Sequence, residues 1–291
     1  MPNIVLIGKT GQVATEVQAV GLPLEWTLRV LGREELDLVN TGLIKPVLTD
    51  AVPAVIVNAA AYTAVDRAED EADLANQING TAVSEIARTA HMLDIPLVHI
   101  STDYVFDGHD TAPRRETDKT NPLGVYGQSK LLGENLIAQS GVRAVILRTS
   151  WVFSSHGSNF VKTMLRLAAT RDTLGVVADQ HGGPTAAHDI ASTVTDMAIR
   201  LHHGAPGTGL YHFSGAPATT WAGFANAIFD QATLLPKRPA IHNISTAEYP
   251  TPARRPAHAV MDCSRLENDY GIGQPDWRSS LQTVLKQLKA A

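Results

Sequence analysis

Cysteine is almost absent from this chain of 291 residues, since Cys263 is its one thiol. A single thiol excludes an intrachain disulfide and fits a reducing compartment, so we expect a cytoplasmic protein. Long apolar runs are also missing. The run at residues 3–7 is too short for a signal-peptide core or a membrane span, and no other run reaches spanning length. We therefore expect no membrane association.

An excess of positive charge is missing too. The chain has 24 Lys and Arg against 29 Asp and Glu, a net charge of -5. This balance gives no electrostatic footprint for nucleic acid, so we predict no nucleic-acid partner. Hydrophobic residues make up 44% of the chain, which is ordinary for a globular protein of one large or two modest domains.

Short β-branched runs alternate with helical stretches through the first two thirds of the chain. The runs expected to form strands are residues 3–7, 27–31, 54–60, 96–102 and 144–150. Helices are expected at residues 11–20, around 74–90, at 126–139 and finally at 277–288. The strands are apolar on both faces, which is typical of a parallel sheet covered on both sides by helices. We predict an α/β, doubly wound (Rossmann) fold.

The texture of the sequence changes after Gly204, where a glycine-rich loop is followed by a proline-rich third. We predict a dinucleotide-binding domain over residues 1–200. Residues 201–291 are expected to form mainly a smaller substrate-binding lobe, interleaved with the first domain.

A glycine turn follows the first predicted strand in the stretch "IGKTGQVA". Gly8 permits a tight turn, and Gly11 lets backbone N–H groups approach a pyrophosphate at a helix N-terminus. Ala14 lies where a helix and a strand pack closely. At the first strand-to-helix turn of an α/β chain, this pattern predicts a dinucleotide site.

The predicted ends of the second and third strands bear on the choice of cofactor. Arg33 follows the second strand and could face a 2′-phosphate, which hints at NADP; a solvated arginine is an equal alternative. Asp37 and Leu38 could line the adenine side. The stretch "NAAAYT" at residues 58–63 ends the third strand with small side chains that leave room for a ribose. NADPH and NADH both remain candidates.

Tyr126 and Lys130 are four residues apart on a predicted helix and therefore share one of its faces. An ordinary phenol has a pKa near ~10, and a nearby ammonium is expected to lower the pKa by stabilising the phenolate. Asn121 is a candidate cap for this helix. The pair could donate a proton to a developing alkoxide, with Lys130 also bonding the nicotinamide ribose.

A hydroxyl group is available at the end of the fourth predicted strand, in "STDYVFDG". Open α/β sheets bind ligands at the carboxyl ends of their strands. We therefore choose Thr102 as the donor to a substrate carbonyl. With the glycine turn and the Tyr126–Lys130 pair, it predicts hydride transfer to a ketone. His99 earlier in this strand is expected to be a core histidine with satisfied hydrogen bonds.

In this order, the motifs resemble the extended short-chain dehydrogenase/reductase family, and within it the branch of dTDP-4-dehydrorhamnose reductases. The resemblance covers nearly the whole chain. It is carried by "GKTGQV", "VNAAAYTAVDRAE", "STDYVFDG", "VYGQSK", "RTSWVF", "NFVKTMLRLA", "DQHGGPT" and "YPTPARRP".

The resemblance implies an activity and a set of site residues. The activity is NAD(P)H-dependent reduction of the C4 keto group of dTDP-4-dehydro-L-rhamnose, the last step of dTDP-L-rhamnose synthesis. The implied catalytic residues are Thr102, Tyr126 and Lys130. Implied contacts to the cofactor are Gly11, Gln12, Val13, Asp37, Leu38, Ala61, Tyr62 and Thr63, together with Tyr126 and Lys130. Implied contacts to the dTDP-sugar are Thr102, Asp103 and Trp151, and Arg254 or Arg255 could pair with its diphosphate.

The resemblance also raises the question of a metal and of a partner subunit. Some members of the family form a homodimer bridged by magnesium through glutamates. Glu16 matches one such position, but His188 stands where another glutamate would be. Because Mg²⁺ prefers oxygen ligands, a magnesium site is doubtful and we predict no metal. A homodimer stays open.

Three other functions compete with this one. A sugar-nucleotide dehydratase of the superfamily would carry a second acid after Asp103, where this chain has Tyr104. An epimerase keeps the same tyrosine and lysine but does not consume its cofactor. The regulatory subunit of methionine adenosyltransferase is similar to these reductases and uses the fold to bind a partner, although the complete trio of Thr102, Tyr126 and Lys130 favours catalysis.

Overall fold

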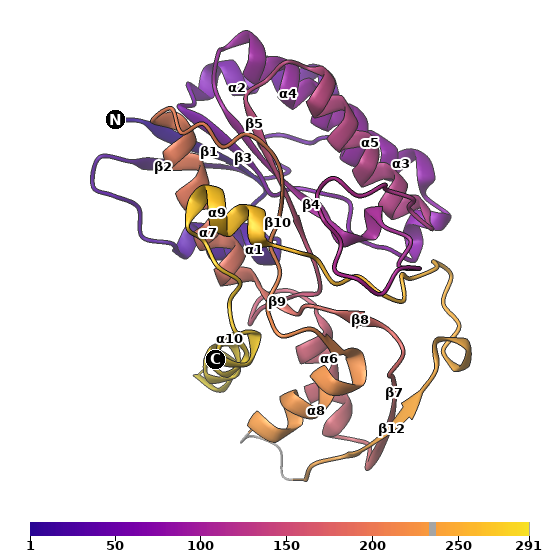
Figure 1. The fold of residues 1–291 in the computed structure, drawn as a ribbon. Helices are drawn as coiled ribbons and strands as arrows, with labels where there is room; N and C mark the ends of the chain where they lie inside the picture. Colours follow the sequence, from indigo (N-terminus) through magenta and orange to yellow (C-terminus); the bar gives the residue numbers. More distant parts are fainter. Residues whose placement is uncertain (233–236, 291) are drawn as a thin grey trace.

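A parallel sheet lies at the centre of the computed structural model, which describes residues 1–232 and 237–290 (Figure 1). Its strands run in the order β10-β5-β4-β3-β1-β2, and every neighbouring pair is parallel. The strands are β1 (Asn3–Ile7), β2 (Thr27–Leu31), β3 (Val55–Asn58), β4 (Leu97–Thr102), β5 (Ala144–Thr149) and β10 (Gly209–His212). The order reverses between β1 and β3, which confirms the predicted doubly wound fold.

Helices cover both faces of this sheet. Alternate residues of β1 point to opposite faces. Val5 and Ile7 pack against α2 (Ile44–Ala51), α4 (Ala82–Met92) and α5 (Val125–Gln139). Ile4 and Leu6 pack against the other set, which is α1 (Gln12–Ala19), α7 (Ala187–His202) and α9 (Ser264–Tyr270). This arrangement explains why the strands are apolar on both faces.

A second lobe lies beyond the carboxyl ends of the strands, below the sheet in Figure 1. Its own apolar cluster includes Phe153, Val176, Phe224 and Trp277. The lobe contains β6 (Val152–Phe153), α6 (Phe160–Ala168), β7 (Thr173–Val177), β8 (His181–Gly182), β9 (Thr185–Ala186), β11 (Thr219–Thr220), α8 (Trp221–Gln231), β12 (Ala240–Ile244) and α10 (Trp277–Ala290). The chain returns to the sheet with α7, β10 and α9, so the two parts are interleaved. The numerical boundary near residue 200 stays a prediction.

The predicted strands and helices lie close to their predicted bounds except around residues 74–90, whereas other elements, among them α2, α6, α7, α8 and β10, were not predicted. The apolar pattern over residues 74–90 forms α3 (Ala72–Asn76), a π-helical turn (Gln77–Thr81) and α4. Short 3₁₀ turns lie at residues 41–43, 67–69, 103–105 and 246–248. None of the helices in the described residues is long and apolar enough to cross a bilayer.

The predicted cap of α5 is wrong. The helix begins at Val125 after Gly124, and the Val125 N–H donates to the Glu69 carboxylate at 3.0 Å. Asn121 instead donates from its amide to Asp107 at 3.1 Å. A side chain from a distant turn thus satisfies the free backbone donor at this helix end.

Candidate active site

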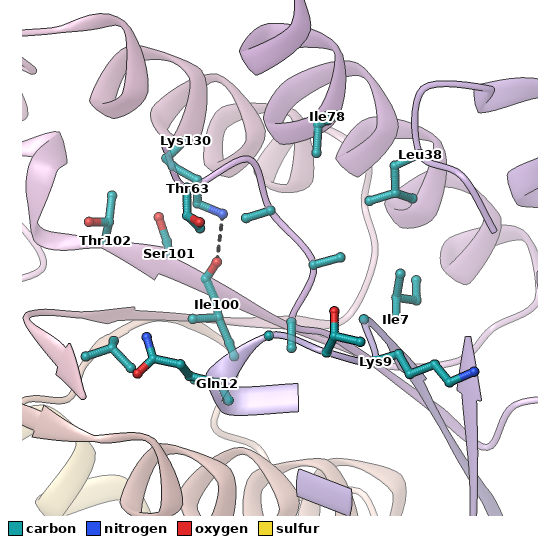
Figure 2. Close-up of a pocket in the computed structure, with 18 of the residues that line it drawn as sticks. Ile7, Lys9, Gln12, Leu38, Thr63, Ile78, Ile100, Ser101, Thr102 and Lys130 are labelled. Carbon is teal, nitrogen blue, oxygen red and sulfur yellow. Dashed lines mark hydrogen bonds between the residues drawn. The ribbon is translucent and has the colours of Figure 1, made fainter. Parts of the chain in front are cut away.

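A cavity of about 740 Å³ opens where the carboxyl ends of β1, β2, β3, β4 and β5 meet. The reversal of strand order places the ends of β1 and β3 beside each other, and the loops after them form the cavity walls. Figure 2 shows Lys130 on one side of this space and Gln12, from the start of α1, on the other. The size is typical of a cofactor or ligand site.

The glycine turn lies against the loop that follows β3. Gly8 has φ of +111°, and a Cβ there would come within 3.2 Å of the Ala60 backbone nitrogen. Gly11 directly precedes α1, and a Cβ there would meet no atom within 4 Å. The backbone can therefore approach a ligand at this helix N-terminus, where free N–H groups favour an anion. Gln12 and Val13 also line the cavity.

Arg33, Asp37 and Leu38 line the end of the cavity next to β2. The Arg33 guanidinium lies 3.3 Å from the Asp37 carboxylate, and the Arg33 side chain is 80% exposed. Leu38 is buried and gives this end an apolar surface. An exposed guanidinium at this point can reach a ligand phosphate without leaving a buried charge unpaired.

The loop after β3 contributes Ala61 and Thr63 to the cavity wall, whereas Tyr62 is not among the lining residues. The Tyr62 hydroxyl donates to the Glu71 carboxylate at 2.7 Å, and its backbone N–H and C=O bind the amide of buried Asn79. Because Tyr62 itself does not line the cavity, its contact with the cofactor stays a prediction. Tyr62 anchors the loop that presents its two neighbours.

Thr102 ends β4, Asp103 follows it, and both line the same cavity. The Thr102 hydroxyl donates to Asp103 Oδ1 at 3.0 Å and accepts from the Tyr104 N–H at 3.2 Å. Asp103 is 2% exposed, and burial raises its pKa to about 7. Its second oxygen, Oδ2, has no hydrogen-bond partner within the described residues.

Tyr126 and Lys130 lie one turn apart on α5 and both line the cavity, as their spacing predicts. Burial raises the pKa of Tyr126 to about 12, and the nearby hydroxyl of Thr102 acts in the opposite direction. Burial also lowers the pKa of Lys130 to about 8. Lys130 Nζ donates to the Ile100 carbonyl at 2.8 Å, drawn as a dashed line in Figure 2, and lies 3.1 Å from His99 Nε2.

The expectation that Lys130 lowers the pKa of Tyr126 is wrong for this arrangement. The Lys130 amino group is directed at β4, and burial of the Tyr126 phenol dominates the pKa of Tyr126. Tyr126 instead has an aromatic neighbour that the sequence interpretation did not include. The Tyr104 ring meets it edge to face, with centroids 5.5 Å apart.

Trp151 forms the cavity wall on the side of the second lobe. Its backbone has φ of +46°, uncommon for a bulky residue, and its ring stacks on Trp221 with centroids 3.6 Å apart. The Trp221 indole N–H donates to Gln180 at 3.1 Å. Trp221 was missed in the sequence because seventy positions separate it from Trp151 and no motif surrounds it.

A buried polar network lies behind the cavity and was also missed. Arg148 of β5 forms two hydrogen bonds to the Glu134 carboxylate, at 2.9 and 2.6 Å. Ser101 donates to the same carboxylate at 2.5 Å. Glu134 lies one turn after Lys130 on α5, and this spacing was the one available sequence signal.

Glu16, His188 and Arg255, which were discussed for a metal or for the diphosphate, have partners within the chain. Glu16 is buried and accepts a hydrogen bond from Ser154 at 2.9 Å. His188 lies 3.4 Å from Asp189. The described part of the chain holds no group of three or more histidine, cysteine or acidic side chains placed to bind a metal. Arg255 pairs with Asp66 at 2.9 Å and does not line the cavity.

Comparisons with known proteins assign this chain to a family. The model for the RmlD substrate binding domain matches residues 2–290. The chain belongs to the dTDP-4-dehydrorhamnose reductase family. It is 44% identical to the dTDP-4-dehydrorhamnose reductase of Sinorhizobium fredii over 286 residues, covering 97% of this chain and 96% of that protein. The Escherichia coli K12 reductase is 39% identical over 293 residues, covering 98% of each chain.

Solved structures agree with this membership. A dTDP-4-dehydrorhamnose reductase from Clostridium acetobutylicum superposes with a TM-score of 0.92 at 33% identity, covering 99% of each chain. The Bacillus anthracis reductase, solved in complex with NADP, gives a TM-score of 0.91 at 32% identity, covering 99% of this chain and 100% of that one. A UDP-glucose 4-epimerase from Brucella ovis shares the fold at 14% identity, so the fold alone does not separate reductase from epimerase.

Proposed function

We propose that this protein reduces the C4 keto group of dTDP-4-dehydro-L-rhamnose to give dTDP-L-rhamnose, with NADPH or NADH as the reductant. One observation carries the proposal: a single cavity at the switch point brings together the glycine turn, Thr102, Tyr126 and Lys130. Family membership supports the same substrate. The bound nicotinamide supplies the hydride.

The cavity fits such a cofactor because its first turn leaves space for a diphosphate. The open side of Gly11 and the N-terminus of α1 would hold the pyrophosphate, next to Gln12 and Val13. Asp37 and Leu38 would line the adenine side, and Ala61 and Thr63 the ribose side. Tyr62 would act only through its loop. Gly8 would keep the loop close to β3.

The catalytic roles follow from position and protonation. Tyr126 carries its proton at neutral pH, since its pKa is about 12, so the phenol is available to protonate O4 as negative charge develops there. Thr102 would donate to the substrate carbonyl, which requires its hydroxyl to leave Asp103. Asp103 would then accept hydrogen bonds from the sugar, and the Trp151 ring would contact its apolar face. Lys130 would bond the nicotinamide ribose.

Cofactor preference depends on Arg33 in this proposal. Its exposed guanidinium can pair with a 2′-phosphate, at the cost of its ion pair with Asp37. We expect Arg33→Ala to raise the Kd for NADPH by up to about tenfold and to leave the Kd for NADH unchanged. Arg29→Ala, which removes a similar surface pair with Asp50, is the control.

We also expect the protein to be cytoplasmic and to form a homodimer. The single thiol of Cys263 supports a reducing compartment. Sedimentation analysis of the purified chain, with and without Mg²⁺, tests the dimer and any role of a metal in it.

The decisive assay follows absorbance of the reduced cofactor during incubation with dTDP-4-dehydro-L-rhamnose. We expect stoichiometric oxidation of NADPH or NADH and formation of dTDP-L-rhamnose. Interconversion of sugar epimers without net cofactor consumption would identify an epimerase instead. Absence of turnover, together with stable association with methionine adenosyltransferase, would support the regulatory function.

A further inference from the structure

A buried asparagine and a buried histidine stand behind the catalytic lysine. Asn58 ends β3 and is 1% exposed, and His99 of β4 is fully buried. Asn58 Nδ2 lies 3.1 Å from His99 Nδ1, and His99 Nε2 lies 3.1 Å from Lys130 Nζ. The three side chains therefore form one hydrogen-bonded chain that ends at the cavity.

The orientation of the asparagine amide is fixed by the backbone. Asn58 Oδ1 accepts from the Ala60 N–H at 3.2 Å, so the other end of the amide, its NH₂ group, faces His99. An NH₂ group can only donate. His99 Nδ1 must then accept, and a neutral imidazole with an acceptor at Nδ1 carries its hydrogen on Nε2.

This tautomer conflicts with an ammonium at Lys130. His99 Nε2–H points at Lys130 Nζ, and an ammonium has only donors. An uncharged amine can accept from Nε2–H and still donate to the Ile100 carbonyl at 2.8 Å. The hydrogen bonds that link Asn58, His99 and Lys130 are all satisfied together only when Lys130 is uncharged.

We propose that Asn58 and His99 are positioning residues for Lys130: they select the Nε2–H tautomer of the histidine, and this tautomer favours the amine of Lys130 over its ammonium. The link to catalysis rests on the function proposed above. When Lys130 gains a proton, His99 must move its hydrogen to Nδ1, and Asn58 must turn and give up the Ala60 N–H.

The nearby charge of Glu134 and the burial of Lys130 shift the pKa of Lys130 in opposite directions. Glu134 on the same helix favours the ammonium, although Arg148 of β5 already neutralises that carboxylate. Asp103 and Tyr126 face the same cavity, together with Tyr104. Burial acts with the tautomer, since it lowers the pKa of Lys130 to about 8 and holds the pKa of His99 well below its usual range.

Asn58→Asp tests the proposal because it reverses the tautomer without changing the shape of the side chain. One carboxylate oxygen can still accept from Ala60, and the other accepts from His99 Nδ1–H. His99 Nε2 then becomes an acceptor for an ammonium. We expect ¹⁵N NMR to place the hydrogen on Nε2 in the parent protein and on Nδ1 in Asn58→Asp.

The titration of Lys130 is the second readout. We expect its ¹³Cε signal, assigned with Lys130→Met, to titrate near pH 8 in the parent and about one to two pH units higher in Asn58→Asp. The double variant Asn58→Asp/His99→Phe separates tautomer from added charge. Loss of most of the shift supports the proposal, and a full shift in the double variant overturns it.

The two hypotheses fail in different ways. The NMR readouts need neither substrate nor turnover, so an inactive protein with the expected tautomers would refute the reductase function alone. An Nδ1–H tautomer in the parent would refute the positioning role even if the enzyme is active. With both correct, the limb of the pH profile of kcat/KM that reports Lys130 lies near pH ~8 in the parent and moves upward in Asn58→Asp by the same interval as the NMR midpoint.

Discussion

The two walls of the cavity are built in different ways. The wall on the side of β1 to β3 comes from short contiguous segments, in which Gly8, Gly11 and Ala61 lie in the loops that follow strand ends. The wall on the side of the second lobe depends on Trp151, which stacks on Trp221 from a helix seventy positions later. The first wall is local in sequence and made largely of backbone, and the second is made of side chains from distant segments. A motif can therefore identify the first wall, whereas only the folded chain assembles the second.

The largest effect is expected at Tyr126, which lines the cavity on α5. Tyr126→Phe removes the proposed proton donor and keeps the ring, so we expect kcat to fall by at least ~100-fold. The Kd for NADPH, measured by fluorescence titration, should stay within about twofold of the parent value, since no lost bond of the phenol involves the cofactor diphosphate.

Tyr211→Phe provides the matched control. This buried tyrosine donates to Asp269 at 2.9 Å on the far side of the sheet and does not line the cavity. Turnover of that variant should match the parent. Near-normal turnover of Tyr126→Phe would remove the phenol from the mechanism.

Asp103 should make stability depend on pH. Its pKa is about 7 in the folded chain and near ~3.9 when unfolded, so the folded state binds more protons between these values and stability falls as the pH rises through them. An asparagine at position 103 cannot ionise, so the variant lacks the loss of stability that ionisation of the buried Asp103 carboxyl causes. We expect Asp103→Asn to stabilise the protein at pH 8, by about 4 kcal/mol at most, and to have little effect at pH 4.

Urea unfolding at the two pH values measures this difference. Asp107→Asn is a useful comparison because the pKa of Asp107 is lowered, chiefly by the His109 backbone N–H, and its removal should destabilise the protein at pH 8. Equal effects of Asp103→Asn at both pH values would contradict the raised pKa of the buried Asp103 carboxyl.

Two glycines of the same turn test the first wall. Gly8→Ala forces a side chain into a backbone with φ of +111° and a Cβ 3.2 Å from Ala60, so we expect a loss of about 1–3 kcal/mol in unfolding free energy. Gly11→Ala meets no atom within 4 Å and should change stability by less than about 0.5 kcal/mol. Thermal unfolding distinguishes them; similar losses would show that the turn is not held by the approach to β3.

Trp221→Leu tests the second wall and should have a smaller effect than the changes at Tyr126, Asp103 and Gly8. Loss of the stacked ring removes the support of Trp151, and an aromatic pair contributes about 0.5–1.5 kcal/mol beyond the area it buries. We expect the KM for the sugar nucleotide to rise several-fold, with the Kd for NADPH unchanged. A change confined to the cofactor would contradict the division of the cavity into two walls.

Particular residues show how far the sequence could lead. The cavity contains the predicted Thr102, Tyr126 and Lys130 because each belongs to a local pattern, a strand end or one helical turn. Tyr62 belongs to an equally clear pattern, yet its side chain turns to Glu71. Nothing local encodes that choice, since Glu71 and Asn79 reach the loop only after α3 and the π-helical turn have packed beside it.

The sequence by itself determined the order of strands and helices, the doubly wound class, and which residues end the strands that meet at the cavity, because hydrophobic period and turn chemistry are local. Tertiary structure alone decided the pKa values of Asp103, Tyr126 and Lys130. It also decided which ring stacks on Trp151 and so supports the second wall of the cavity. These depend on burial and on neighbours far away in the chain, and such distances exist only once the chain is folded.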